Sequence, residues 1–284
     1  MDAAFAFIGF GEAGAAFAGG AAARGYDRKT DDRATRDAKL VDFDRAGVRA
    51  CADSAEAVAG IGAVLSLVTA DQALAAAQTA ARRIARGTLW FDMNSVAPDT
   101  KRAAAEAIEA GGGRYVDVAV MAPVHPKRLA VPLLIGGPHA EEAAAFLATI
   151  GFTDVTQVSG PVGQASSIKM IRSVMVKGIE ALTAECFLAA DAAGVGEAVR
   201  TSLDASWPGT DWESKADYNL DRMMVHGLRR AAEMEEVVKT LDSLGSGSAM
   251  TRGTIERQRA IGGLGLTPQG DLAAKLTAIR GATL

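Results

Sequence analysis

The chain has 284 residues, of which 49% are hydrophobic and 23% charged, and at about 100–200 residues per domain this length predicts two domains. The 30 Lys and Arg residues against 34 Asp and Glu residues give a formal net charge of −4, which argues against nucleic acid or an anionic membrane as a partner. Two cysteines and three scattered histidines offer neither a disulfide framework nor metal-ligand spacing, so we predict no metal site.

The first apolar segment, residues 4–8, is predicted to be a β-strand and not part of a secretion signal. Asp2 precedes it, Glu12 follows it, and no basic residue lies before it, whereas a signal peptide begins with basic residues. The chain also lacks a run of about 18 apolar residues. We therefore expect a cytoplasmic protein that neither enters nor spans a membrane.

Short β-like runs alternate with Ala-rich helical segments from residue 4 to about 155, a pattern typical of a parallel sheet covered by helices. After residues 4–8, the predicted strands are 26–29, 48–51, 63–68, 88–93, 114–118 and 132–135, and the predicted helices are 14–23, 37–45, 72–83, 99–110 and 141–150. A helix over 166–193, about 40 Å long, and further helical patterns follow. The predicted fold class is therefore α/β, with a Rossmann-type parallel-sheet domain (1–162) followed by an all-α domain (163–284).

A Gly-x-Gly-x-x-Gly pattern directly follows the first predicted strand and opens the first predicted helix, as in dinucleotide-binding proteins. Gly9 permits the tight turn, Gly11 lets the backbone approach a pyrophosphate, and Gly14 lets helix and strand pack closely. The helix N-terminus would then hold the phosphates. We assign the whole loop, Gly9, Phe10, Gly11, Glu12, Ala13 and Gly14, to a site for NAD or NADP.

Asp27 lies 18 residues after Gly9, at the expected end of the second strand. A carboxylate there accepts hydrogen bonds from the adenosine ribose hydroxyls and favours NAD. Arg28 and Lys29 follow it and would favour the 2′-phosphate of NADP, or they belong to a solvated loop. Only twelve residues separate Gly14 from Asp27, fewer than is usual in the family that this loop and the later segments resemble, and the resemblance therefore implies a short first helix or a clipped second strand. NAD and NADP both remain open.

Three further segments follow the glycine loop. Residues 91–98 read Phe-Asp-Met-Asn-Ser-Val-Ala-Pro, residues 117–123 read Asp-Val-Ala-Val-Met-Ala-Pro, and residues 163–173 read Gly-Gln-Ala-Ser-Ser-Ile-Lys-Met-Ile-Arg-Ser. Together the four segments resemble a divergent branch of the β-hydroxyacid dehydrogenase family, which contains 3-hydroxyisobutyrate dehydrogenase and 6-phosphogluconate dehydrogenase. The resemblance implies hydride transfer between a nicotinamide cofactor and a small hydroxy acid or its oxo form.

The resemblance also assigns residues to the two ligands. Asn94 and Ser95 stand at the family's Ser-Thr pair beside the nicotinamide, and Val68 and Thr69 are assigned to the cofactor site with them. Where the family binds substrate through Ser-Gly-Gly, this chain departs from the pattern and has Met121, Ala122 and Pro123. Arg172 and Ser173 replace two asparagines and are assigned to the substrate site.

Lys169 falls on the family's catalytic lysine, the general acid/base. Moving hydride from an alcohol requires a base within hydrogen-bond reach of the hydroxyl, and a lysine serves only if its pKa is lowered from about 10.4. Ile168, Met170 and Ile171 offer apolar surroundings, and Arg172 at i+3 offers a positive charge on the same helical face. The alternative is a lysine and an arginine on an exposed face.

A proline-containing loop carries three groups that can be cationic, His125, Lys127 and Arg128, and Arg172 adds a fourth. Cationic groups that converge on one site indicate a substrate with a carboxylate or phosphate. In the alternative, Lys127 and Arg128 are solvated and His125 points inward. His226 is also assigned to the substrate site. It lies on a helical segment with Arg229 and Arg230, which in a structural reading pair with Glu233 and Glu236.

Two other functions fit the same residues. One is an imine or ketimine reductase of similar architecture, and the other is a non-catalytic dinucleotide-binding protein that has lost turnover. The apolar stripes of the Ala-rich helices exceed what one small domain buries, which predicts a homodimer or a higher homo-oligomer.

Overall fold

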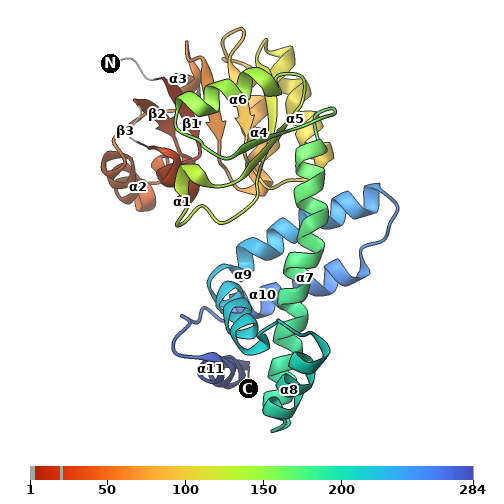
Figure 1. Cartoon of the computed structure of the whole chain (residues 1–284). Coiled ribbons are helices and arrows are strands. Elements are labelled where there is room, and N and C mark those ends of the chain that lie inside the picture. The colour runs from red at the N-terminus through yellow and green to blue at the C-terminus, as the bar shows by residue number, and fades with distance from the viewer. Residues whose placement is uncertain (1–3, 20–21, 284) are drawn as a thin grey trace. The chain divides into compact units, whose positions relative to one another are not determined.

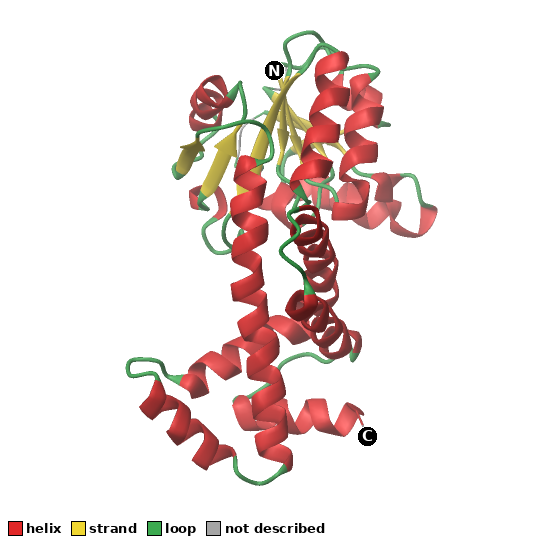
Figure 2. Cartoon of the chain, turned by 90° about the vertical axis from the view of Figure 1, so that its right-hand side faces the viewer, coloured by secondary structure: helices red, strands yellow, loops and turns green. Residues whose placement is uncertain are grey.

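The structure, a computed structural model, describes residues 4–19 and 22–283. The chain divides into two compact units, Met1–Met170 and Ile171–Leu284. Among the described residues, every strand lies in the first unit and the second unit is built from helices (Figure 2). The predicted order, a Rossmann-type sheet domain followed by a helical region, is confirmed.

The first unit contains one mixed sheet. In the described part of the chain it has eight strands in the order β3-β2-β1-β4-β5-β6-β7-β8. All neighbouring strands are parallel except β6 and β7. The strands are β1 (Phe5–Ile8), β2 (Ala23–Tyr26), β3 (Val48–Ala50), β4 (Ala63–Ser66), β5 (Leu89–Asp92), β6 (Arg114–Val120), β7 (Leu133–Gly136) and β8 (Val155–Val158). Strand order reverses between β1 and β4, the position at which open α/β sheets bind their ligands.

Helices cover both faces of this sheet (Figure 1). Alternate residues of β1 divide between two cores: Phe5 and Phe7 pack with α1, α2 and α6, whereas Ala6 and Ile8 pack with α3, α4 and α5. The α-helices are α1 (Glu12–Phe17), α2 (Arg33–Arg45), α3 (Ser54–Val58), α4 (Ala73–Ala81), α5 (Pro98–Ala110) and α6 (Ala140–Thr149), with short 3₁₀ turns η1 (Arg28–Thr30), η2 (Ala70–Gln72) and η3 (Arg128–Ala130). Both faces of the central strands are therefore buried, as continuous apolar runs predict.

The connection between β1 and β2 differs from the prediction. The first helix, predicted over 14–23, ends at Phe17, and residues 20 and 21 of that range lie outside the described residues. The second strand, predicted over 26–29, is Ala23–Tyr26. Asp27 accepts a hydrogen bond from the Lys29 backbone N at 2.9 Å, and this local side-chain bond begins η1 in place of a longer strand.

Two elements have weak sequence signals and were not predicted. Helix α3 has only five residues, and its N-terminus is defined by Asp53, whose carboxylate accepts from the Glu56 N at 2.8 Å. Strand β8 lies at the sheet edge and its side chains are exposed or half-buried, so it shows no apolar alternation. The antiparallel direction of β7 follows from a connection that contains η3 in place of a crossover α-helix.

The second unit contains most of α7 (Gln164–Ala192), followed by α8 (Gly196–Ser206), α9 (Trp212–Ser243), α10 (Ala249–Gly263) and α11 (Leu272–Thr283). Helices α9 and α10 cross at Gly227 and Gly262. A Cβ added at Gly227 would lie 2.8 Å from the Gly262 Cα and 2.4 Å from the Gln258 carbonyl oxygen, so the backbones touch directly. Within residues 4–19 and 22–283, none of the helices is both long and apolar enough to cross a membrane.

Candidate functional site

The predicted cofactor residues gather at one edge of the sheet in the first unit. Strands β1, β2, β4 and β5 are parallel, so their carboxyl ends meet at the same edge. Directly after β1 come Gly9, Phe10 and Gly11; Asp27 follows β2; Val68 and Thr69 follow β4; Asn94 and Ser95 follow β5. The structure thus brings together residues that are up to 86 positions apart in sequence, from Gly9 to Ser95.

The three loop glycines meet different requirements. Gly9 has φ +85°, and a Cβ there would lie 2.6 Å from the Leu67 carbonyl oxygen, so no other residue fits. A Cβ at Gly14 would lie 2.9 Å from the Phe10 ring. At Gly11, by contrast, a Cβ would meet no described protein atom within 4 Å. Protein packing therefore does not require glycine at this position, whereas close approach of a pyrophosphate does, and the residues present fit a dinucleotide.

Charged side chains bind both backbone polar groups of Phe10. Its N–H donates to Asp27 Oδ2 at 2.7 Å, and its carbonyl accepts from Lys39 Nζ at 2.8 Å. Lys39 is buried on α2 and also binds Asp42 at 2.7 Å. The Phe10 ring stacks on Phe43, with 4.3 Å between the centroids. Sequence reasoning did not find Lys39, because nothing in its spacing from the loop marks it.

Asp27 already accepts hydrogen bonds from the protein itself. Its two oxygens accept from Phe10 N and Lys29 N, and a carboxylate has about four acceptor positions, so capacity for ribose hydroxyls remains. The side chains of Arg28 and Lys29 are exposed on η1. The structure therefore leaves both cofactors open: Asp27 can bind the ribose of NAD, and Arg28 and Lys29 are free to approach the 2′-phosphate of NADP.

Lys169 contacts Ser95 within the first unit. Lys169 Nζ and Ser95 Oγ are 2.6 Å apart, which joins α7 to the loop after β5. The Lys169 side chain is half-buried. Its apolar surroundings differ from those predicted, because Ile168 is 38% exposed while Met170 is buried. The two residues are 74 positions apart in sequence, so Lys169 is held against the sheet domain by a tertiary contact.

A buried polar cluster lies behind this contact. Lys101 Nζ donates to the Asp92 carbonyl at 2.5 Å and to Asp92 Oδ1 at 3.0 Å, and lies 3.6 Å from Asp117 Oδ1. The Tyr115 hydroxyl donates to Asp92 Oδ2 at 2.6 Å. Burial, and to a smaller extent the negative charge of Asp92, raise the pKa of this tyrosine well above its usual value. Lys101 and Tyr115 were not predicted, since buried polar pairing has no local sequence signal.

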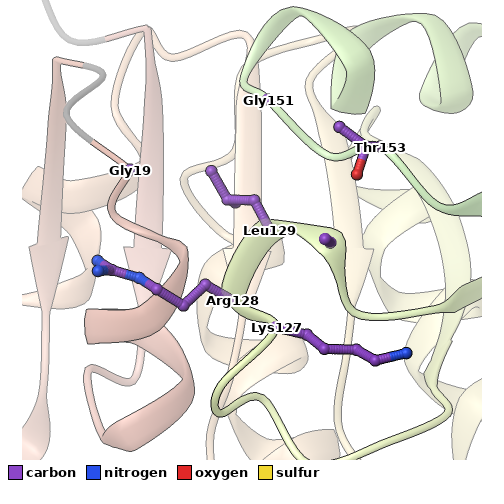
Figure 3. Close-up of a pocket in the computed structure, with 7 residues that line it drawn as sticks. Gly19, Lys127, Arg128, Leu129, Gly151 and Thr153 are labelled. Atoms are coloured by element: carbon purple, nitrogen blue, oxygen red, sulfur yellow. The ribbon is translucent and has the colours of Figure 1, made fainter.

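The predicted substrate loop follows β6 at the same edge of the sheet. Met121 N donates to the Pro132 carbonyl at 2.9 Å, which places Met121, Ala122 and Pro123 at the start of this loop. His125, expected to point inward, is exposed. Lys127 and Arg128 extend in opposite directions beside a shallow cavity of about 430 Å³ (Figure 3). The predicted convergence of cations in this loop is therefore not seen for these two residues.

The remaining predicted residues belong to the second unit. On α7, Arg172 is exposed and Ser173 is buried; on α9, His226 is half-buried. Arg230 pairs with a glutamate on another helix. It is buried and donates from Nε to Glu180 Oε2 at 3.0 Å, and Gln258 Nε2 donates to the same oxygen at 2.9 Å. Arg230 thus joins α9 to α7 in the core.

Comparison with known proteins gives two family matches and a series of similar structures. Residues 4–159 match the NAD binding domain of 6-phosphogluconate dehydrogenase, and residues 190–261 match a domain of unknown function (DUF1932). A conserved hypothetical protein of Sinorhizobium meliloti is 38% identical, with a TM-score of 0.76 over 99% of this chain and 97% of that one.

Two other solved structures extend the comparison. The conserved protein of unknown function MTH1747, whose structure is described as similar to 3-hydroxyacid dehydrogenases, is 28% identical, with a TM-score of 0.69 over 99% of both chains. The Mycobacterium tuberculosis 3-hydroxyisobutyrate dehydrogenase, solved with L-serine, is 16% identical, with a TM-score of 0.74 over 99% of this chain and 100% of that one, and this likeness concerns the fold alone. The glycine loop, the strand order and the family match agree: the chain belongs to the family defined by the NAD-binding domain of 6-phosphogluconate dehydrogenase, with NAD or NADP as the cofactor.

Proposed function

We propose that the protein is an NAD(P)-dependent oxidoreductase that interconverts a small anionic hydroxy acid and its oxo form, with Lys169 as the general acid/base. The observation that supports this most is the 2.6 Å contact between Lys169 Nζ and Ser95 Oγ. Ser95 follows β5 at the edge that also carries the glycine loop. In this proposal, the proton-transferring group contacts the loop after β5, at the sheet edge that carries the glycine loop.

Each residue of the proposed site has a distinct task. The bound cofactor supplies or accepts the hydride. The N–H groups of the first turn of α1 have no intrahelical acceptors, and together with Gly11 they hold the pyrophosphate. Lys169 takes the hydroxyl proton in oxidation and returns it in reduction. Ser95 can accept from the ammonium form and donate to the neutral amine, so it orients Lys169 in both protonation states.

The substrate end of the proposal rests on residue chemistry. Met121, Ala122 and Pro123 give the loop after β6 an apolar character, which favours a short carbon chain over a polyhydroxylated one. Arg172, three residues after Lys169 on α7, is proposed to bind the anionic group of the substrate, because a guanidinium binds carboxylate or phosphate in a bidentate manner. Ser173 on α7 and His226 on α9 are also proposed as substrate-binding residues.

Substitution of Gly11 tests the cofactor site with a matched control. Gly11→Val should weaken binding of NADH or NADPH by about tenfold or more, because the new side chain fills the space where backbone and pyrophosphate approach. Gly62, at the opposite end of β4, also has no described atom within 4 Å of an added Cβ, so Gly62→Val should bind as the wild type does. Fluorescence titration of each reduced nucleotide measures both.

The same titration decides between the functional classes. Lack of binding of either nucleotide by the wild type would overturn the proposal. Binding without turnover of short 2- and 3-hydroxy acids, their oxo forms and cyclic imines would favour the non-catalytic reading. Turnover of imines alone would identify an imine reductase.

We also propose that a second copy of the chain covers an apolar stripe on the second unit. Ile171, Met175 and Leu182 on α7 are 48%, 65% and 57% exposed, and Val225 and Leu228 on α9 are 54% and 57% exposed. Exposed aliphatic side chains at near-heptad spacing on a long helix are typical of a helix-packing surface. Sedimentation should give a dimer or larger species, and Met175→Glu should shift it toward the monomer; a wild-type monomer would contradict this.

A further inference from the structure

We propose that Lys101 is a positioning residue that fixes both partners of the Ser95–Lys169 contact, acting on one through Asp92 and on the other through Asp117. This inference rests on the proposed function of Lys169. Lys101 lies on α5, and its side chain is only 1% exposed. Its ammonium group donates to Asp92 and to the Val118 carbonyl and lies beside Asp117. Lys101 therefore acts through other residues and is not itself catalytic.

The Asp92 side of the cluster determines where Ser95 lies. Asp92 ends β5, and its Oδ1 accepts from the Asn94 backbone N at 3.0 Å and from Asn94 Nδ2 at 2.7 Å. Asn94 Nδ2 also donates to Ser66 Oγ on β4 at 3.1 Å. These bonds fix the residue immediately before Ser95. The ammonium group of Lys101 and the hydroxyl of Tyr115 in turn hold the Asp92 carboxylate.

The Asp117 side of the cluster determines where Lys169 lies. Asp117 Oδ2 accepts from Gly163 N at 3.0 Å, from Ser166 N at 3.1 Å and from Ser166 Oγ at 3.4 Å. It therefore caps the N-terminus of α7, where an anion also interacts favourably with the helix dipole. Lys169 lies one turn further along the same helix. The other oxygen, Asp117 Oδ1, has the Lys101 ammonium 3.6 Å away.

One buried cation thus joins the two segments. Asp92 and Asp117 lie on adjacent strands, and both of their side chains are at most 1% exposed. The repulsion between two buried carboxylates is offset when a positive charge lies close to both. Without Lys101, the loop after β5 and the first turn of α7 would lose the positive charge that holds their two carboxylates together. Ser95 and Lys169 would then separate.

A charge-balanced variant separates positioning from general stability. Lys101→Met alone leaves two carboxylates uncompensated and should unfold at lower temperature. Combining it with Asp117→Asn restores the net charge of the cluster, because one cation and one anion are removed together. The double variant should therefore recover most of the Tm lost in the single variant. NADH affinity should stay within about twofold of the wild type, since the glycine loop is untouched.

The informative readout is the reactivity of Lys169, which needs no substrate. Trace labelling with acetic anhydride, followed by peptide mass spectrometry, gives the acetylation rate of Lys169 relative to exposed Lys239. This ratio should rise about tenfold in the double variant, the factor expected for loss of one net hydrogen bond. Ser95→Ala, which deletes the contact directly, should raise the ratio equally. A double variant that regains its Tm with an unchanged ratio would overturn the proposal.

Tyr115→Phe keeps the proposal testable if the double variant fails to fold. It removes one donor to Asp92 without altering any charge, and should raise the labelling ratio by about twofold; no change would contradict the Asp92 part of the inference. Turnover by Lys169→Met separates the two proposals. If that variant retained full activity, the proposed role of Lys169 would be wrong, whereas the labelling result would still report whether Lys101 positions it.

Discussion

Replacing Lys169 by methionine is expected to lower kcat by about 10²- to 10⁴-fold, the range typical for loss of a general acid/base. Methionine retains the apolar stem and removes only the amine, so the packing of α7 is preserved. Because the proposed site holds the cofactor through the glycine loop, the affinity for NADH or NADPH should be unchanged. Steady-state kinetics with the best substrate, together with a nucleotide titration, measure the two effects.

The control for this variant is Lys239→Met, which removes an exposed lysine on α9 with a 62% exposed side chain and should leave kcat unchanged. Ser95→Ala should give an intermediate loss of kcat, since Lys169 remains but is no longer oriented. A Lys169→Met variant with wild-type kcat would contradict the alcohol mechanism. It would instead favour an imine reductase with a different proton donor.

Replacing Arg230 by methionine is expected to destabilise the second unit by about 3–5 kcal/mol, the cost of leaving a buried ion pair with one partner. Glu180 is 4% exposed and, without Arg230, would keep the neutral hydrogen bond from Gln258 Nε2 but lose its charged partner. Urea unfolding followed by circular dichroism measures the change in the free energy of unfolding. A loss below about 1 kcal/mol would show that water or another group solvates Glu180.

Two matched variants make this result specific. Arg230→Met combined with Glu180→Met removes both charges and should recover most of the lost stability, because hydrophobic replacement of a buried pair is often neutral or favourable. Arg259→Met breaks the exposed pair with Glu235, whose side chains are 54% and 49% exposed. That loss should be at most about 1 kcal/mol, as is usual for surface pairs.

The sequence predicts those features that depend on local spacing. The turn at Gly9 and the place of Asp27 after the second strand are expected from the order strand, glycine loop, helix, strand, and residues 4–159 match an NAD binding domain. The direction of β7 and the edge strand β8 could not be predicted in this way. Strand direction depends on how a connection packs, and an exposed edge strand carries no apolar alternation.

In the candidate site too, local motifs could be predicted from the sequence, whereas contacts that depend on tertiary packing could not. Lys169 and Ser95 were each identified from short motifs, but their mutual contact spans 74 positions and depends on tertiary structure. Lys101 gives no signal at all, because an isolated lysine in a predicted helix is normally solvated. Its burial between Asp92 and Asp117 depends on the packing of α5 against the sheet. The partner of Arg230 could not be predicted for the same reason, because it lies on another helix.

The two hydrogen bonds to the Phe10 backbone bear on how fast and how tightly a dinucleotide associates. Asp27 binds the peptide group before Phe10 and Lys39 binds the one after it, so both are fixed within the protein itself. Immobilising a loop on association consumes part of the interaction free energy. A glycine loop that is already rigid loses little conformational entropy when the nucleotide arrives, so nucleotide association should approach a simple lock-and-key process, with a single kinetic phase and no slow isomerisation.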